Sequence, residues 1–186
     1  MAVEVTKRRF TADEYLRMAE TGILSPADRV ELIEGEIIQM SPVGNRHVAC
    51  VDRANSLFVT NLAGKAIVSV QNPIRLSNYT EPQPDIVLLQ HRPDYYAAKR
   101  HSPEDTLLVI EVSDTTLRYD RNRKAPLYAK SGVTELWIEN LEGDVILVFR
   151  DPGPEGYSTT LVFRRGESVS LLAFPDILFK VDELLG

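Results

Sequence analysis

One segment of the sequence is strongly apolar and yet contains a carboxylate. Residues 107–113 read Leu-Leu-Val-Ile-Glu-Val-Ser, and such a run is typical of a strand that is buried on both faces of a sheet. A carboxylate inside such a strand costs free energy unless it is paired, protonated or bound to a metal ion. Glu111 therefore either lies at a solvated end of the strand or belongs to a functional site.

A second carboxylate stands at the start of another apolar segment. Asp85 follows Glu81-Pro82-Gln83-Pro84, and we expect strand 85–89 to begin at this aspartate because proline cannot donate a hydrogen bond to a strand ladder. By itself, an aspartate in this place is more often a turn residue. Two acids on neighbouring strands repel each other unless a cation lies between them, and carboxylates without clustered Cys or His favour Mg²⁺ or Mn²⁺ as that cation.

The hydrophobic pattern predicts an α/β fold with a central mixed sheet, in a single domain over residues 1–186. We expect a helix from a capping box at Thr11 to residue 20, a hairpin over 29–40, a helix over 46–62, strands 66–76, 85–89 and 107–113, a helix over 120–130, strand 135–139, a hairpin of 145–149 with 159–164 around a turn at 151–156, and a closing helix or turn over 175–185. Strands 107–113 and 135–139 are joined through a helix, so they should be parallel.

Three further residues are candidates on helices and turns. Asp120 and Lys124 are four residues apart on one helix and so share a face. An exposed ion pair is the commoner outcome for such a pair, and a functional role requires Lys124 to reach Glu111. His47 lies near the start of helix 46–62, where a solvated histidine is the commoner outcome and a contact with phosphate or with a metal-bound water is the alternative.

The composition limits the partners and the location that we expect. With 21 Lys and Arg against 27 Asp and Glu the net charge is −6, so a nucleic acid would have to bind through a local basic patch, for which the candidates are Arg75, Arg118, Arg121 and Arg123. The single cysteine, Cys50, excludes an internal disulfide and a thiolate metal cluster, and we expect it to pack as a small apolar residue. Without a signal peptide or membrane span, we expect a cytoplasmic protein that does not associate with membranes.

The motifs, taken in order, resemble the PD-(D/E)XK nuclease superfamily, and more closely the bacterial Uma-two family of endonuclease-like proteins, a domain of unknown function. The resemblance covers residues 11 to 185. The segments that carry it are Glu31-Leu32-Ile33-Glu34-Gly35-Glu36-Ile37, Ser41-Pro42 with His47, Pro82-Gln83-Pro84-Asp85, Val109-Ile110-Glu111-Val112-Ser113, Asp120 with Lys124 and Tyr128, and Gly132-Val133 with Glu135-Leu136-Trp137-Ile138. It implies a restriction-endonuclease-like fold, with a core of helix, three strands, helix and strand between an N-terminal helix and hairpin and a C-terminal β-hairpin.

The resemblance also implies a metal-dependent endonuclease mechanism. Asp85, Glu111 and the backbone carbonyl of Val112 would hold one Mg²⁺ (or Mn²⁺), which would activate a water for attack on a nucleic-acid phosphodiester, above all in DNA, and leave a 5′-phosphate and a 3′-hydroxyl. Glu34, which is otherwise a turn residue beside Gly35, would bind the ion through water or hold a second ion. The superfamily's lysine is expected two residues after the glutamate.

In this sequence Ser113 occupies the place of that lysine, so the lysine's role maps onto Lys124. This departure favours an alternative, a catalytically inactive nuclease fold that binds a nucleic acid or a protein. A hydrolase of another phosphodiester, such as a nucleotide signal, and a scaffold that assembles through the hairpin over 145–164 are two further alternatives. Exposed strand edges in that hairpin favour a homodimer in each of these cases.

Overall fold

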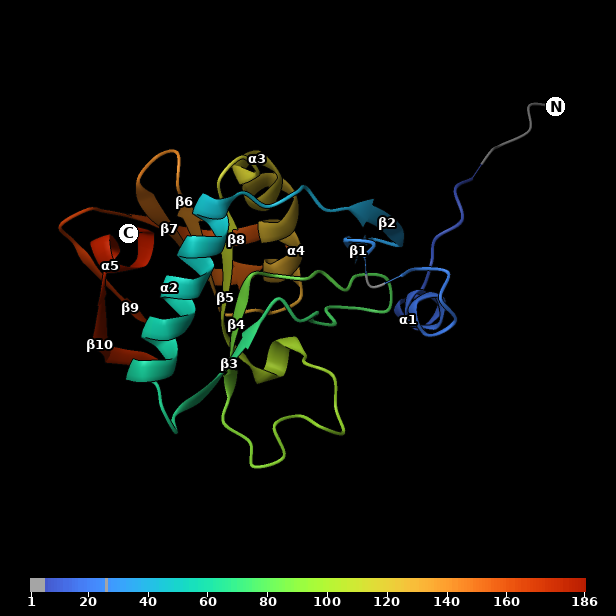
Figure 1. The fold of residues 1–186 in the computed structure, drawn as a ribbon, viewed down its shortest axis with the longest axis horizontal. Coiled ribbons are helices and arrows are strands. Elements are labelled where there is room, and N and C mark those ends of the chain that lie inside the picture. Colours follow the sequence, from blue (N-terminus) through green and yellow to red (C-terminus); the bar gives the residue numbers. More distant parts are fainter. Residues whose placement is uncertain (1–5, 26) are drawn as a thin grey trace.

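The structure is a computed structural model that describes residues 6–25 and 27–186. The chain runs through α1 (Ala12–Glu20), β1 (Val30–Ile33), β2 (Glu36–Gln39), α2 (Asn45–Asn61), β3 (Ala66–Val70), β4 (Ile86–Gln90), η1 (Pro103–Asp105), β5 (Thr106–Ser113), α3 (Leu117–Tyr119), η2 (Asp120–Lys124), α4 (Ala125–Lys130), β6 (Glu135–Asn140), β7 (Val145–Gly153), β8 (Gly156–Arg164), β9 (Ser168–Leu171), β10 (Phe174–Lys180) and α5 (Val181–Leu185) (Figure 1). In the described part of the chain, no helix is long and apolar enough to cross a membrane.

A six-stranded mixed sheet forms the centre of the fold, in the order β3-β4-β5-β6-β7-β8. All neighbours in it are antiparallel except β5 and β6, which are parallel. The parallel pair is the one that the helical crossover between these strands predicts. The predicted α/β architecture with a central mixed sheet and flanking helices and hairpins is confirmed.

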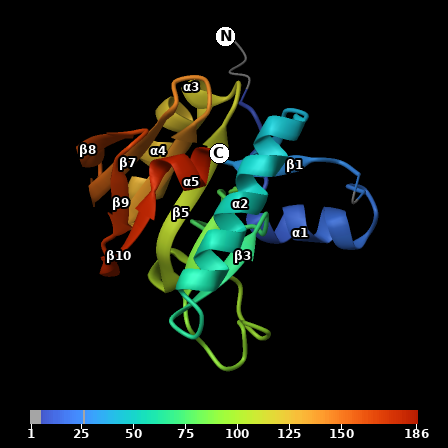
Figure 2. The same cartoon turned by 60° about the vertical axis from the view of Figure 1, so that its left-hand side comes forward.

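Helices cover both faces of this sheet (Figure 2). On one face, α2 and α5 pack through Phe58 and Leu184 against apolar residues such as Trp137. On the other face, α4 packs through Tyr128 against Val109 and its neighbours. Because successive side chains of a strand point to opposite faces, Glu111 lies on the α4 face with Val109, whereas Ile110 and Val112 face α2.

The helix that follows β5 contains one wide turn. Within η2 the chain is π-helical, and the backbone N–H of Ala125 donates to the carbonyl oxygen of Asp120, five residues earlier. π-Helical turns are rare and occur frequently at functional sites. In this protein the turn carries both Asp120 and Lys124, which are buried although the sequence favoured an exposed pair.

Several predicted boundaries were wrong. Strand 66–76 ends at Val70, because Gln71 adopts a left-handed backbone conformation (φ 50°) that breaks the ladder. Strand 85–89 begins at Ile86, one residue after the aspartate. The turn expected over 151–156 is tighter, since β7 extends to Gly153. Pro152 is tolerated there because β7 pairs with β6 only as far as Arg150.

The C-terminal part contains a hairpin that the pattern did not predict. We expected a closing helix or turn over 175–185, but β9 and β10 form a two-stranded antiparallel sheet, and only α5 is helical. At the other end of the chain, the β1–β2 hairpin docks through Leu32, which exchanges backbone hydrogen bonds with Glu81. This contact brings the hairpin beside the segment that leads into β4.

Candidate active site

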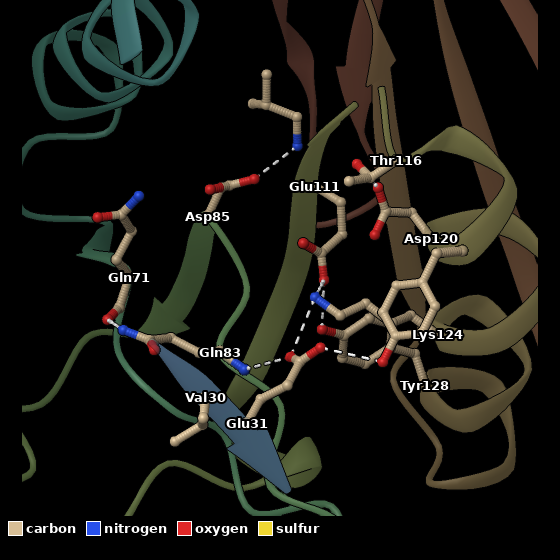
Figure 3. Close-up of polar contacts among 12 residues, drawn as sticks. Val30, Glu31, Gln71, Gln83, Asp85, Glu111, Thr116, Asp120, Lys124 and Tyr128 are labelled. Atoms are coloured by element: carbon tan, nitrogen blue, oxygen red, sulfur yellow. Dashed lines mark hydrogen bonds and ion pairs between the residues drawn. The ribbon is translucent and has the colours of Figure 1, made fainter. Parts of the chain in front are cut away.

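A buried lysine is held between two carboxylates on the α4 side of the sheet. Lys124 Nζ lies 3.0 Å from Glu111 Oε1 and 3.3 Å from Glu31 Oε2, and all three side chains are buried. The hydroxyl of Tyr128 donates to the same Glu111 oxygen at 2.6 Å. Figure 3 shows the three charged groups converging from β5, η2 and β1.

Glu31 has its own set of partners, which fix its orientation. Its Oε1 accepts a hydrogen bond from the hydroxyl of Tyr119 at 3.2 Å, and its Oε2 accepts one from the backbone N–H of Gln83 at 3.2 Å (Figure 3). The N-terminal hairpin thus contributes a carboxylate to the site and connects the lysine to the segment before β4.

Asp85 directly precedes β4, the strand next to β5 in the sheet. Ile86 pairs with Ile110 in the antiparallel ladder, so Asp85 comes next to Glu111 at the end of that ladder. Its Oδ2 accepts a hydrogen bond from the backbone N–H of Val112 at 2.9 Å and lies 3.1 Å from Nε2 of His47 on α2. Asp85 is therefore held from both elements that flank it.

Asp120 is held by hydroxyl groups and does not pair with Lys124. Its Oδ2 accepts hydrogen bonds from the side chains of Ser113 at 2.7 Å and Thr116 at 2.6 Å. Ser113 therefore fixes the wide helical turn that carries Lys124. Although Ser113 occupies the superfamily's lysine place, the ammonium group still reaches Glu111 from the helix.

Burial raises the pKa values of Glu111 and Asp120 in this site. Burial raises the pKa of Glu111 to about 8, with Asp120 and Asp85 adding to the effect and Lys124 opposing it. Burial also raises the pKa of Asp120, against its hydrogen bonds. For Lys124, burial alone lowers the pKa, but the negative charges of Glu111 and Glu31 outweigh it and raise the pKa, so the lysine stays charged.

His47 is buried and paired, so the solvated first-turn position was the wrong expectation. Burial by itself lowers the pKa of His47, but the hydrogen bond and charge of Asp85 outweigh it and raise that pKa. Its Nδ1 is buried without a hydrogen-bond partner among the described residues.

Cys50 on the same helix does more than pack as an apolar residue, since its thiol donates to Glu139 Oε2 at 2.9 Å.

These side chains lie at a cavity of about 960 Å³. Its lining includes the acids Glu31, Asp85, Glu111 and Asp120, together with Lys124 and His47. Concave sites with a few convergent polar groups and perturbed pKa values are typical of active sites. The cavity is therefore the candidate active site of this chain.

The sequence matches a known protein family. A family model described as "Uma2: Putative restriction endonuclease" matches residues 12–182, which is most of the chain. The chain belongs to the Uma2 family. No curated protein matches it.

Solved structures extend the Uma2 comparison to the fold. A crystal structure described as "a putative nuclease belonging to DUF820 from Anabaena variabilis ATCC 29413" superposes with a TM-score of 0.72 at 17% identity, over 95% of this chain and 97% of that one. This likeness shows the restriction-endonuclease-like fold. The type IIG restriction endonuclease BpuSI matches 65% of this chain and 14% of its own length at 19% identity, with a TM-score of 0.42 that is too low to support an argument.

Asp85 and Glu111 of this Uma2 protein could provide a small set of oxygen ligands for a divalent cation. In the described part of the chain, no three His, Cys, Asp or Glu side chains form a group that could enclose a metal ion. Asp85 Oδ1 and Glu111 Oε2, however, accept no hydrogen bond from the described residues, since the bonds to these carboxylates go to the other oxygen of each. Mg²⁺ is commonly held by one or two carboxylates while it keeps several waters. The donor set therefore fits Mg²⁺ or Mn²⁺.

The structure does not bring every predicted residue of the Uma2 site together. Glu34 lies at the hairpin turn and pairs with Arg123 at 2.7 Å, with both side chains partly exposed. Of the arginines expected to contact phosphate, Arg75 instead forms ion pairs with Asp13 and Glu81. Arg118 and Arg123 line the cavity, and Arg121 does not.

Among the residues at the cavity of this Uma2 protein that were not candidates from the sequence are Glu31 and Arg29. Glu31 contacts Lys124, and Arg29 lines the cavity. The sequence feature that could have identified Glu31 as a site residue is its position in the same acidic hairpin motif as Glu34. Because alternate residues of a strand face opposite sides, the register of β1 decides which acid faces the site, and that register depends on the long-range contact of Leu32 with Glu81.

Proposed function

We propose that this protein is a metal-dependent endonuclease that hydrolyses phosphodiester bonds in nucleic acid, with DNA as its substrate. The main observation in support of the proposal is the contact between Lys124 and Glu111. Lys124 approaches Glu111 to 3.0 Å in a buried site beside Asp85. Glu111 and Asp85 each keep one carboxylate oxygen that accepts no hydrogen bond from the described residues. The Uma2 family description and the restriction-endonuclease-like fold support the same reaction class.

Asp85 and Glu111, with the backbone carbonyl of Val112, would hold the cation. Once bound, Mg²⁺ or Mn²⁺ supplies charge neutralisation at the phosphate and activation of a water. The protein's own contribution is positioning. Tyr128 fixes Glu111, and the N–H of Val112 and the ring of His47 fix Asp85, so that the free oxygens stay in place.

Lys124 supplies a fixed positive charge at the same place. Its ammonium group is held by Glu111 and Glu31, and it can stabilise negative charge that develops on the phosphate or orient the attacking water. In the proposed hydrolysis, water adds to phosphorus, the bond from phosphorus to the 3′ oxygen breaks, and the leaving oxygen takes up a proton. The products are a 5′-phosphate and a 3′-hydroxyl.

Metal-dependent turnover by purified protein tests this proposal. Plasmid DNA, single-stranded DNA and RNA are incubated with Mg²⁺ or Mn²⁺, or with a chelator, and product ends are identified by labelling. We expect cleavage with metal only, lost in Glu111→Gln and retained in Glu155→Gln, which changes an exposed glutamate at the β7–β8 turn. Metal-dependent cleavage that persists in Glu111→Gln would reject the assignment, and no cleavage of any substrate would favour the inactive, binding alternative.

We also propose that the protein acts in the cytoplasm as a homodimer that pairs through β8. This strand ends the sheet order, and no described strand covers its outer edge. Leu161 and Val162 on it are exposed, and an uncovered apolar edge strand is a ready template for pairing with another chain. Light scattering should report a dimer for the wild-type protein and a monomer for Leu161→Lys. A monomeric wild-type protein would exclude the dimer.

A further inference from the structure

The candidate active-site cavity has two walls that are far apart in the sequence. One wall is residues 38–44, from the end of β2 to the start of α2, and the other is residues 114–124, between β5 and α4. Figure 1 shows the chain after β2 crossing from the hairpin to the start of α2. The catalytic carboxylates therefore lie between two walls.

Two ion pairs join the N-terminal side of the cavity to the opposite wall. Arg123 Nη2 lies 2.7 Å from Glu34 Oε2, and Arg46 Nη1 lies 3.6 Å from Asp114 Oδ1. All four side chains are partly exposed, and exposed pairs of this kind contribute only about 0–1 kcal/mol each. These weak contacts connect the two sides of the cavity.

Two guanidinium groups line this cavity without an acidic partner. Arg29 lies on the hairpin side and Arg118 on the opposite wall, and neither forms an ion pair within residues 6–25 and 27–186. An arginine without a carboxylate partner presents a planar fork of donors that matches phosphate oxygens.

The wall formed by residues 38–44 brings several apolar side chains to the cavity. Ile38, Met40, Pro42 and Val43 line the cavity there, together with Gln39, Ser41 and Gly44. Bases that are not stacked in a duplex expose flat apolar faces, and proteins commonly cover those faces with aromatic or apolar side chains. The cavity thus combines donors for phosphate with an apolar surface for bases.

The size of the cavity and the distribution of charge disfavour a duplex. A volume of about 960 Å³ falls within the roughly 300–1,000 Å³ of pockets that enclose a small ligand. Outside the cavity, most of the described arginines and lysines pair with carboxylates. With a net charge of −6, the protein as a whole gives a duplex little electrostatic attraction.

We propose that this cavity binds an unpaired nucleic-acid strand, with Arg29 and Arg118 contacting backbone phosphates and residues 38–44 contacting the bases. This inference rests on the proposed nuclease function, because it names the form of substrate for the same site. A duplex would reach the carboxylates only where its strands are separated.

Equilibrium binding in a chelating buffer, where no substrate is consumed, tests the inference. Fluorescence anisotropy is measured with a labelled DNA strand of about 12 nucleotides, within the usual range of single-strand sites, with an RNA strand of the same sequence, and with the DNA strand annealed to its complement. We expect at least one of the single strands to bind about tenfold or more tightly than the duplex, a difference of about 1.4 kcal/mol. The DNA and RNA strands together show which sugar the site accepts.

Arginine variants connect the binding to the cavity. We expect Arg29→Ala and Arg118→Ala each to weaken strand binding about tenfold and to lower the slope of log affinity against log salt by about 0.7. Arg29→Lys should fall between wild type and alanine, because it keeps the charge but loses the planar fork. The matched control is Arg17→Ala, an exposed arginine on α1 outside the cavity lining, which should bind as wild type. Melting temperatures identify any variant that fails to fold.

Three results would overturn the inference: duplex binding that equals or exceeds strand binding, no binding of either single strand, or wild-type affinity in both folded alanine variants. None of them affects the proposed hydrolysis, which is judged by metal-dependent cleavage and its loss in Glu111→Gln. Conversely, strand binding through Arg29 and Arg118 without any cleavage would keep the binding assignment and reject the nuclease.

Discussion

Lys124 Nζ lies 3.0 Å from Glu111 Oε1, and both side chains are almost completely buried. The contact joins the helix after β5 to that buried central strand, and it brings a positive charge to Glu111 although Ser113 stands two residues after this glutamate. Glu31 approaches the same ammonium from the N-terminal hairpin at 3.3 Å. Stability and proposed catalysis therefore depend on the same three charged groups.

Replacing Lys124 by methionine should destabilise the protein strongly. Lys124→Met would leave two buried carboxylates without their cation, and breaking a buried pair in this way costs about 3–5 kcal/mol. We expect the melting temperature to fall by roughly 10 °C or more. Lys65→Met, an exposed position after α2, serves as the control and should change little. A Lys124→Met protein as stable as wild type would show that the lysine does not hold the cluster together.

Glu31 should behave as a positioning residue, and Glu34 provides a matched comparison on the same hairpin. Glu31 fixes Lys124, whereas Glu34 is partly exposed and pairs with Arg123. Glu31→Gln should lower kcat about tenfold, a loss of about 1.4 kcal/mol, with little change in KM, and Glu34→Gln should retain kcat. Partial rescue by Glu31→Asp would separate positioning from folding. The opposite order of the two variants would favour the metal-binding role that the family resemblance implies for Glu34.

The apolar run around Glu111 was enough to predict a central buried strand. It also indicated that Glu111 is either at a solvated strand end or part of a functional site. The predicted parallel crossover from β5 to β6 followed from the helix between them. The approach of Lys124 to Glu111 came only from the family resemblance. Helical spacing alone favoured an exposed pair with Asp120, because it does not show the π-helical turn that buries both residues.

The features that the sequence did not predict depend on long-range contacts or unusual backbone. Glu31 reaches the site because Leu32 pairs with Glu81, about fifty residues away in the chain. β3 ends early because Gln71 adopts a left-handed conformation, which glutamine rarely favours. The short strand β9 buries only Val169 and Leu171, too few residues to give a clear alternating pattern.

Glu139 should make stability fall as the pH rises. Burial raises the pKa of Glu139 to about 7 from an ordinary value of 4.5, so between these values the folded state holds a proton that the unfolded state has released. The contribution of Glu139 to the free energy of unfolding is therefore greatest below pH 4.5, and it is lost as the pH rises through 7.

Thermal unfolding of Glu139→Gln at two pH values tests this dependence. The variant cannot ionise at this position, so its melting temperature should match wild type near pH 5 and exceed it by about 5 °C near pH 8.5. Cys50, which donates to Glu139, is unchanged in both proteins. An equal difference between the two proteins at both pH values would show that Glu139 does not titrate in this range.

Calorimetric titration with Mn²⁺ most directly tests the claim that Asp85 and Glu111 together hold a divalent cation. We predict saturable binding to the wild-type protein, a rise in melting temperature with Mn²⁺, and affinity at least about tenfold weaker in Asp85→Asn and Glu111→Gln, a loss of about 1.4 kcal/mol. Glu155→Gln, the exposed control, should bind as wild type. A flat titration of the wild-type protein, or unchanged affinity in both site variants, would contradict the account.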